Sequence, residues 1–171
     1  MTFTASNVDA IIPSVLEGHS LSLAIYTTGH DLDAALCGID FLFGQTTTQA
    51  PHTALAENVV QQLHRYLDDP QRPFDLPLSM HGTDFQRRLW SALCDVPSGH
   101  TATYGQLVKR LGMRGGAQAV GQACRRNPVP IVVPCHRILS QSGMGGYAGE
   151  TGGEKLHFKQ ALLKHEGSIH A

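Results

Sequence analysis

The sequence predicts an α/β N-terminal domain, a small antiparallel sheet plus a helix, followed by a mainly α C-terminal domain with a helix-turn-helix. Two short β-rich segments precede one amphipathic helical segment in the first half of the chain. The stretch DDPQRPFDLPLSMHG then breaks all periodicity with three prolines and a glycine. After it, apolar residues recur at helical spacing. Because 171 residues suffice for two small domains, we place them at residues 1–80 and 81–171.

The first domain is predicted to contain two strands and one helix. The segments SLSLAIYTT (residues 20–28) and LCGIDFLF (residues 36–43) are short and rich in strand-forming residues, and the turn-like GHDLDAA separates them. Apolar residues keep helical spacing across residues 53–67, which predicts an amphipathic helix there.

The second domain opens with a predicted helix over TDFQRRLWSAL, residues 83–93. Thr83 suits the N-cap position, and Gln86 follows three residues later, so the two can form a capping box. Leu89 and Trp90 belong to one apolar face of this helix. The segment VPSGH ends it.

Two further short helices, joined by a glycine-bearing turn, follow in TYGQLVKRLGMRGGAQAVGQACRRNP and form a helix-turn-helix candidate. The second of them carries small residues at four positions: Ala117, Ala119, Gly121 and Ala123. A glycine inside a helix costs roughly 0.5–1 kcal/mol relative to alanine, so the bare surface needs a reason. Either the helix packs tightly against another helix, or it approaches something bulky such as the wall of a DNA groove. Arg125 and Arg126 at its end favour the second interpretation.

Beyond the Asn-Pro pair that ends this helix, residues 131–133 (Ile-Val-Val) are predicted to form a short buried strand, which Pro134 terminates. The final helix is predicted over KLHFKQALLKHEG, residues 155–167, with Gly167 as its C-cap.

Charge is distributed unevenly, although the net charge is only −1. Residues 1–80 carry two Lys/Arg against nine Asp/Glu, a net charge of −7. Residues 81–171 carry eleven Lys/Arg against five Asp/Glu, a net charge of +6. This asymmetry indicates that the second half meets a polyanion. The alternative is that the two halves attract each other.

Several global features indicate a cytoplasmic protein without a membrane segment. The four cysteines are scattered without a C-x-x-C pair, and no run approaches the roughly 18 apolar residues of a membrane span. The N-terminal residues lack the basic and apolar regions of a secretory signal. We expect no metal and no cofactor, because no ligands cluster at zinc-finger spacing. An ion site in the first half stays open because of four histidines there: His19, His30, His52 and His81.

The stretch NPVPIVVPCHRILSQSGMGGYAG sets a cysteine beside a histidine and follows them with a glycine-rich loop. Because the thiolate is the nucleophile, Cys135 needs a nearby base, and His136 is the candidate. Glu166 is our choice for the group that orients the imidazole. Neighbouring side chains on a strand point to opposite faces, so contact requires a bend at Pro134 or a bridging water. On these two residues alone, a small buried side chain beside a surface histidine is the simpler interpretation.

The wider pattern resembles the O6-alkylguanine-DNA alkyltransferases, also called methylated-DNA–protein-cysteine methyltransferases. The resemblance rests on FQRRLW, YGQL, NPVPIVVPCHRI and LLKHEG, which occur in the family's order. It covers residues 76–167, whereas residues 1–75 share only the strand–strand–helix plan. It implies a DNA-repair enzyme that moves the alkyl group of O6-alkylguanine, and also of O4-alkylthymine, to Cys135. The transfer would be stoichiometric and irreversible, and it would follow flipping of the nucleotide.

The resemblance also implies roles for other residues. His136 would act as general base through a water, with Glu166 polarising it. Asn127 would tie the second short helix to the active-site segment. Tyr104 would contact the target nucleotide and help to protonate the departing guanine, whereas Arg137 would be a structural ion-pair residue. Three residues would wall the base pocket: Tyr147, Ala148 and Cys124.

By the same resemblance, the second short helix would enter the minor groove of double-stranded DNA, where a bare helix fits. The DNA-binding residues would be Ala117, Gln118, Gly121, Arg125 and Arg126. We expect a monomer that is associated with the nucleoid.

Two departures from the family pattern stand out. Gln118 occupies the position of the family's usual arginine, and it lacks the guanidinium plane that stacks on bases. We therefore predict slower capture of lesions in duplex DNA, although Arg114 in the preceding turn could compensate. The connection over residues 149–159 is longer than usual. It either widens the pocket for larger alkyl groups or is a surface insertion without effect.

Two other classes of function stay open. An alkyltransferase-like protein would bind lesions with little repair activity. Such proteins carry tryptophan in place of the acceptor cysteine, so Cys135 argues against this alternative. Gln118 argues for it, because it indicates altered DNA binding. A Cys-His hydrolase or acyltransferase would need an oxyanion hole and multiple turnovers.

Overall fold

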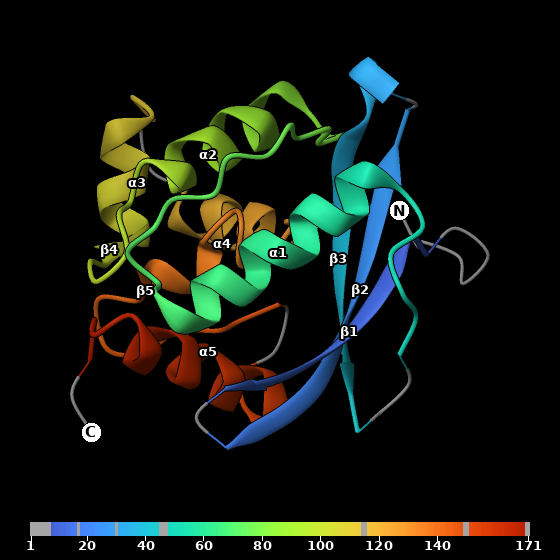
Figure 1. The fold of residues 1–171 in the computed structure, drawn as a ribbon. Helices are drawn as coiled ribbons and strands as arrows, with labels where there is room; N and C mark the ends of the chain where they lie inside the picture. The colour runs from blue at the N-terminus through green and yellow to red at the C-terminus, as the bar shows by residue number, and fades with distance from the viewer. Residues whose placement is uncertain are drawn as a thin grey trace. The chain divides into compact units, whose positions relative to one another are not determined.

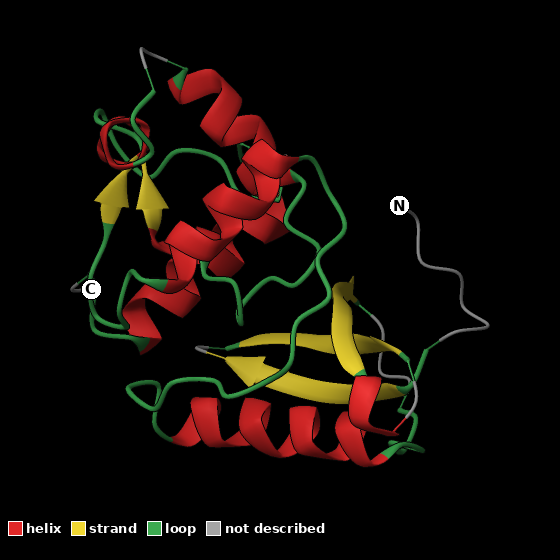
Figure 2. Ribbon diagram, turned by 90° about the horizontal axis from the view of Figure 1, so that it is seen from above, coloured by secondary structure: helices red, strands yellow, loops and turns green. Residues whose placement is uncertain are grey.

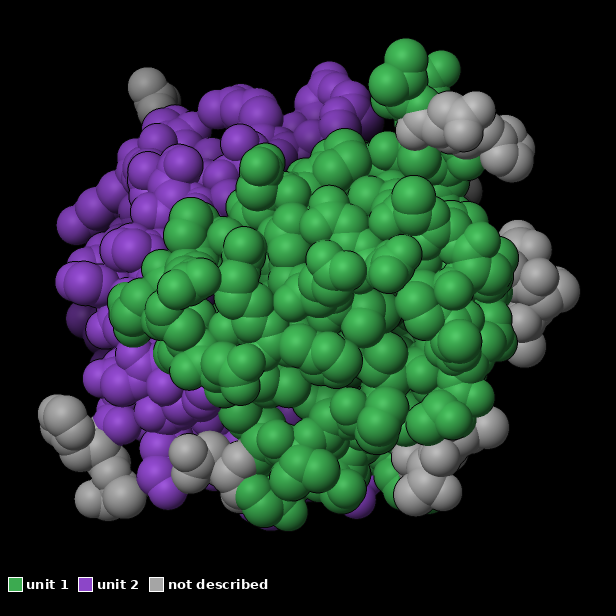
Figure 3. All heavy atoms as spheres, viewed as in Figure 1, with its two compact units in different colours: residues 1–81 green, residues 82–171 purple. Residues whose placement is uncertain are grey.

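The structure is a computed structural model, drawn in Figures 1 and 2. It describes residues 8–16, 18–29, 31–44, 48–113, 116–148 and 151–169. The chain divides into two compact units, residues 1–81 and residues 82–171, which Figure 3 colours green and purple. Each unit is described by itself.

Unit 1 is a three-stranded antiparallel sheet with a helix along one face (Figure 2). The strands are β1 (Ala10–Leu16), β2 (His19–Thr28) and β3 (Ala35–Phe43), in the order β1-β2-β3. All residues of the central strand from Leu21 to Tyr26 are buried. The helix is α1 (Ala54–Asp68). The two strands and the helix predicted for this half are confirmed to within one residue at each end.

The edge strand β1 is a strand of unit 1 that the sequence did not predict. Pro13 lies inside it, and a proline argues against a central strand because it has no N–H to donate. Here the N–H of Ile11 points away from β2 and bonds to the carbonyl of Gln49 at 2.9 Å. Pro13, two residues further on, faces the same way. The missing donor therefore costs no hydrogen bond between β1 and β2.

Helix α1 begins directly after its N-cap residue, and its buried residues follow the predicted apolar spacing. Thr53 is the N-cap, and its side-chain oxygen accepts the N–H of Ala56 at 3.1 Å. Val59, Leu63 and Tyr66 are buried at helical spacing, on the face that contacts the sheet.

Unit 2 begins with α2 (Asp84–Cys94), which has the predicted capping box. Thr83 Oγ1 accepts the N–H of Gln86 at 3.2 Å, and Gln86 Oε1 accepts the N–H of Thr83 at 2.9 Å. Leu89 and Trp90 are buried, as the apolar face predicts.

Two short helices follow, α3 (Tyr104–Arg110) and α4 (Ala117–Arg125), and they pack against each other. The strand β4 (Ala102–Thr103) precedes α3 and pairs in parallel with β5 (Ile138–Leu139). This pairing brings the start of α3 beside the segment that follows the Cys-His pair.

Internal packing explains only part of the bare surface of α4. Ala123 is buried, and its carbonyl accepts the indole N–H of Trp90 at 3.0 Å. Ala117 and Ala119 are exposed instead. A side chain at Gly121 would have room, because its Cβ would meet no neighbouring side chain closer than 3.9 Å. The outer residues of α4 are therefore small for a reason outside the core of unit 2.

The buried strand predicted over residues 131–133 is wrong. The segment is buried, but it forms a turn in which the N–H of Val133 bonds to the carbonyl of Val129 at 2.9 Å. Ile131 has φ +74°, a left-handed conformation that a β-branched residue rarely adopts. The physical reason is the proline on either side of the three residues, since each removes an N–H that a ladder would need.

The last helix is α5 (Gly153–His165), which begins two residues before the predicted start. Gly167 follows it with φ +73° and donates its N–H to the carbonyl of Lys164 at 2.9 Å. The N–H of Ser168 bonds to the carbonyl of Leu163 at 2.9 Å, which completes a Schellman motif. The predicted role of Gly167 in ending the helix is confirmed.

The coarse fold class is therefore confirmed: a small antiparallel sheet with a helix, followed by a mainly helical unit. None of the helices in the described ranges combines the length and apolar character that crossing a membrane requires.

Candidate active site

The thiol of Cys135 lies at the start of the 3-10 turn η3 (Cys135–Arg137) and not on a strand. Cys135 is a free cysteine, 5% exposed, and its N–H bonds to the carbonyl of Val133 at 2.8 Å. No hydrogen bond joins its sulfur to His136 in the described part of the chain. The turn supplies the bend that sequence reasoning required, without bringing thiol and imidazole into direct contact.

Asn127 connects the end of α4 to this thiol. Its Nδ2 donates to the carbonyl of Val133 at 2.7 Å and to the sulfur of Cys135 at 3.2 Å. Its Oδ1 accepts the N–H of Val129 at 3.0 Å. One amide side chain therefore closes the turn before Cys135 and also contacts the nucleophile.

His136 and Glu166 form a buried pair. His136 Nε2 lies 2.9 Å from Glu166 Oε1, and both side chains are 0% exposed. The other ring nitrogen, Nδ1, is buried and has no hydrogen-bond partner among the described residues. A carboxylate beside Nε2 favours the tautomer with its proton there, so Nδ1 is left as the acceptor. The imidazole is thus oriented as a base through Nδ1.

Arg137 binds the same carboxylate with two nitrogens. Its Nε lies 2.9 Å from Glu166 Oε2 and its Nη2 lies 2.8 Å from Glu166 Oε1. Its Nη1 donates to the carbonyl of Val96 at 2.6 Å. This two-point geometry fixes the carboxylate plane. The ion pair predicted for Arg137 is confirmed.

The electrostatics of the turn keep the thiol and the imidazole neutral at rest. Burial raises the pKa of Cys135, against the hydrogen bond from Asn127 and the charge of Lys159. Burial also lowers the pKa of His136, against the hydrogen bond to Glu166. Burial works to raise the pKa of Glu166 as well, but the hydrogen bonds from His136 and Arg137 and the nearby positive charge outweigh it and bring that pKa to about 2. Of the thiol, the imidazole and the carboxylate, only the carboxylate is charged, and Arg137 is its counter-charge.

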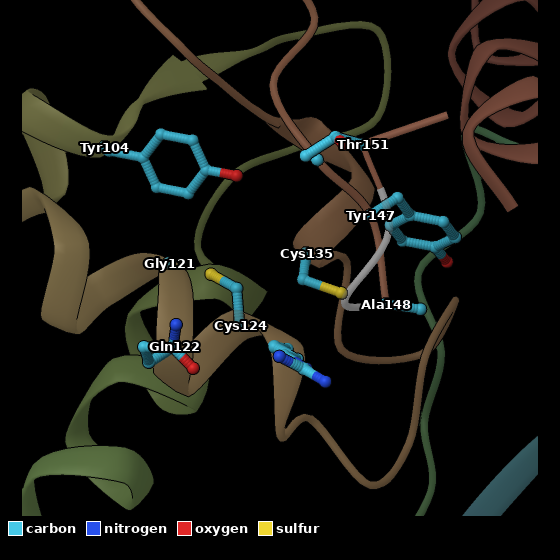
Figure 4. A pocket seen from close by; sticks show the side chains of 10 residues that line it. Tyr104, Gly121, Gln122, Cys124, Cys135, Tyr147, Ala148 and Thr151 are labelled. Atoms are coloured by element: carbon cyan, nitrogen blue, oxygen red, sulfur yellow. The ribbon is translucent and has the colours of Figure 1, made fainter. Parts of the chain in front are cut away.

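A cavity of about 200 Å³ opens beside the thiol (Figure 4). Pockets for drug-sized ligands span roughly 300–1,000 Å³, so this one suits a single flat group. Its lining comes from α3, α4, η3 and the segment before α5: Tyr104, Gly121, Gln122, Cys124, Arg125, Cys135, Gly146, Tyr147, Ala148 and Thr151.

Tyr104 forms one wall, with its hydroxyl turned toward the side where Cys135 and Thr151 lie (Figure 4). Burial raises the pKa of Tyr104 to about 12, so the phenol stays protonated and can donate a hydrogen bond. Gly145 packs on this ring with φ +69°, and a Cβ there would lie 3.2 Å from Tyr104 Cε2. Glycine is what allows the loop to approach so closely.

The cavity lining includes all three residues predicted for a base pocket. Tyr147 is buried, and Ala148 has φ +46°, an unusual conformation for a residue with a side chain. Cys124 brings a second buried thiol from α4, and its pKa is raised by burial and by Cys135.

The residues predicted to bind DNA divide between the cavity and the surface. Ala117 and Gln118 are exposed on the first turn of α4, and Arg126 is exposed at its C-cap. Gly121 and Arg125 line the cavity instead. Arg114 lies outside the described residues.

Sequence reasoning missed four residues of the site: Gln122, Gly146, Thr151 and Lys159. Thr151 lines the cavity and belongs to the connection over residues 149–159, of which 149 and 150 lie outside the described residues and 153–159 are helical. Lys159 is fully buried behind the cavity. Its position beside buried Phe158, on a helix with a wide apolar face, was the available signal.

Across the described ranges, no group of three or more His, Cys, Asp or Glu side chains could hold a metal ion. His30, one of the four histidines considered for an ion site, lies outside those ranges.

Comparisons with known proteins agree on one family. The family model described as "6-O-methylguanine DNA methyltransferase, DNA binding domain" matches residues 84–168. The methylated-DNA–protein-cysteine methyltransferase of Mycobacterium tuberculosis (strain CDC 1551) is 40% identical over 123 residues, which are 71% of this chain and 72% of that relative. The protein of the same name from Methanosarcina acetivorans is 36% identical over 136 residues, 76% of this chain and 84% of the relative.

Solved structures extend the similarity to nearly the whole chain. The structure of Mycobacterium tuberculosis OGT in complex with DNA superimposes with a TM-score of 0.72 at 35% identity and covers 92% of this chain and 91% of that one. The matching sequence includes the buried Cys-His turn and the glutamate that binds it. The chain belongs to the methylated-DNA–protein-cysteine methyltransferase family.

Proposed function

We propose that this protein repairs DNA by transferring the alkyl group of O6-alkylguanine, and also of O4-alkylthymine, to Cys135 in a single irreversible turnover. One observation carries the proposal: a buried thiol opens into a cavity for one flat group and is backed by an imidazole–carboxylate pair. The sulfur attacks the alkyl carbon, the S–C bond forms and the C–O6 bond breaks. Because the thioether is stable, each molecule removes one alkyl group.

The proton of the thiol passes to His136 Nδ1 through a water molecule. The orientation of the ring by Glu166 and the accepting state of Nδ1 support this route. Arg137 keeps Glu166 ionised, so the carboxylate stabilises the imidazolium as it forms. The sulfur is thereby deprotonated only as it reacts, which reconciles a raised pKa at Cys135 with nucleophilic attack.

The target nucleotide leaves the duplex and enters the cavity, since a stacked base cannot reach a buried sulfur. Tyr104 helps to protonate the departing base: its raised pKa keeps the phenol protonated as a hydrogen-bond donor, and the proton that His136 takes from the thiol balances the one that the base gains. Backbone groups of the loop at Tyr147 and Ala148 read the guanine edge, while Cys124 closes the side of α4.

Helices α3 and α4 act as the helix-turn-helix that binds double-stranded DNA, with α4 in the minor groove. The small exposed residues of α4 support close approach to a groove wall. Arg126 holds phosphate, Arg125 reaches it from the rim of the cavity, and Gln118 stands in the gap left by the flipped base. The positive net charge of residues 81–171 supports an anionic partner. The DNA complex of the mycobacterial relative is consistent with this function.

We further propose that residues 81–171 form the transferase domain and residues 1–80 a separate N-terminal domain. The protein works as a monomer associated with the nucleoid.

Intact-mass spectrometry after incubation with O6-methylguanine DNA tests the function. We expect the protein to gain one methyl group, to stop there, and to carry it on the Cys135 peptide. A Cys135→Ser variant is expected to bind the same DNA and to gain nothing. If the variant clears methyl groups at the parent's rate, the proposal is wrong.

The same experiment separates the two alternatives. Unchanged mass together with a retained DNA complex would indicate a lesion-binding protein. The absence of both a mass gain and a retained DNA complex would favour a Cys-His hydrolase. The presence of a cysteine at the acceptor position already argues for repair.

A further inference from the structure

Lys159, on the inner side of α5, is a cation of unit 2 whose hydrogen bonds all go to backbone carbonyls. Its side chain is 0% exposed, and burying an ammonium is costly unless its donors are satisfied. Its Nζ donates to the carbonyls of Ile138 at 2.7 Å, Met144 at 2.8 Å and Gly146 at 3.2 Å. An ammonium has three N–H groups and no acceptor, so donors and carbonyls match in number.

These carbonyls belong to the segment that forms the wall of the cavity. Ile138 begins β5, directly after the Cys-His turn. Gly146 lines the cavity itself and precedes Tyr147 and Ala148, which line it too. One side chain of α5 therefore ties both ends of the segment that connects the nucleophile to the pocket wall.

We propose that Lys159 is a positioning residue: its charged amine holds residues 144–148 in the shape that admits a base, and the wall is fixed only while that amine is protonated. The proposal deepens the proposed function, on which it rests for the identity of the pocket's occupant. The ordering of residues 144–148 by Lys159 does not depend on the proposed function.

Protonation matters because of the donor count. A neutral amine has two N–H groups and presents its lone pair to the third carbonyl, where two electron-rich atoms repel each other. Burial lowers the pKa of Lys159 to about 8, while Cys135 and Cys124 act to raise it. Among the described residues, these two thiols and the imidazole of His136 are titratable groups that interact with the charge of the amine. The wall is therefore expected to loosen as the pH rises through about 8.

Hydrogen exchange of the full-length protein tests the proposal without any DNA. Peptides that cover residues 138–148 are followed in wild type, in Lys159→Met and in Lys164→Met, an exposed lysine on the same helix. We expect Lys159→Met to speed exchange by roughly tenfold or more at neutral pH, as the loss of hydrogen bonds to a charged donor implies. Lys164→Met should match wild type.

A pH series separates the lysine from its neighbours. After correction for intrinsic exchange, wild type should lose protection between about pH 7 and about pH 9.5, whereas Lys159→Met should show no transition. Lys159→Met keeps both thiols and the imidazole. A transition that persists in it with the same midpoint would overturn the proposal, as would equal protection of the loop in both proteins. If Lys159→Met does not fold, the absence of a transition in wild type alone would refute the proposal.

The rate of methyl capture provides a second, independent test of the positioning role. Lys159→Met should capture methyl groups at least roughly tenfold more slowly than wild type at neutral pH, with Arg in place of Met restoring part of the rate. If wild type captures no methyl group, the proposed function fails while the exchange result still stands. If both proteins capture it equally fast, the positioning role is refuted.

Discussion

Glu166 binds two buried groups at once, an imidazole and a guanidinium. Replacing its carboxylate by an amide would leave Arg137 without its counter-charge in a buried site. We expect Glu166→Gln to lower the free energy of unfolding by about 3–5 kcal/mol, the cost of breaking a buried pair from one side. Urea denaturation at neutral pH measures this.

Glu154→Gln is the matched control, because Glu154 is an exposed residue on the first turn of the same helix. We expect its stability to stay within about 0.5 kcal/mol of wild type. A similarly small loss in Glu166→Gln would mean that the pair contributes nothing to folding.

Gln118 is exposed at the start of α4, with an uncharged side chain where the family usually has arginine. An added guanidinium would stack on the bases beside a flipped nucleotide and attract phosphate. We expect Gln118→Arg to increase the single-turnover rate on duplex O6-methylguanine DNA several-fold, with little change on the free base. An unchanged or lower duplex rate would contradict this reading of Gln118.

At this scale the sequence singled out side chains by their own chemistry. Cys135 and His136 were predicted as an adjacent thiol and base, and Glu166 as one of the few carboxylates in this half of the chain. Lys159 was not, because its role comes from three backbone carbonyls that only the folded chain brings together.

Among the elements, the capping box of α2 is a local signal that the structure reproduces. Thr83→Ala removes the side-chain acceptor for the N–H of Gln86. We expect a loss of about 1 kcal/mol in the free energy of unfolding. Thr101→Ala, at an exposed position outside any helix or strand, should change stability by less than about 0.5 kcal/mol in the same denaturation experiment.

Helices were predictable because of the apolar spacing within them, which a side-chain N-cap accompanies in α1, α2 and α3. The short strands β4 and β5 were not predicted, and two further failures involve proline. Pro13 concealed a strand, because the sequence does not reveal that its nitrogen faces the outer edge of the sheet. The apolar run at 131–133 was taken for a strand, because burial alone does not distinguish a strand from a turn.

For the whole molecule, two buried groups make stability rise with pH, each in its own pH window. The folded pKa of Glu166 is about 2 against 4.5 unfolded, so its stabilisation is complete above pH 4.5 and is lost as the pH falls toward 2. The unfolded state binds more protons than the folded state across that window. For one group with a pKa shift of this size, the stability lost is roughly 3 kcal/mol.

Lys159 acts on the alkaline side. Its folded pKa of about 8 lies below the unfolded value of 10.5, so the unfolded state again holds more protons in between and stability rises from pH 8 to 10.5. We expect urea midpoints to show this alkaline rise in wild type and to lack it in Lys159→Met. A flat alkaline profile in wild type would contradict the lowered pKa of Lys159.

The boundary between the two compact units falls at the end of the proline-rich stretch, from which the sequence predicted a domain boundary. The cavity could not be predicted. Its lining comes from α3, α4, η3 and the segment before α5, which only the packing of unit 2 brings together.

Trp90 is the only tryptophan of the chain, and its indole N–H bonds to a carbonyl near the end of α4. An indole emits light whose wavelength depends on the polarity around that N–H. A displacement of α4 that changes the polarity around this N–H would therefore shift the emission wavelength of Trp90. Lesion capture can be followed in real time by emission alone, with no dye attached.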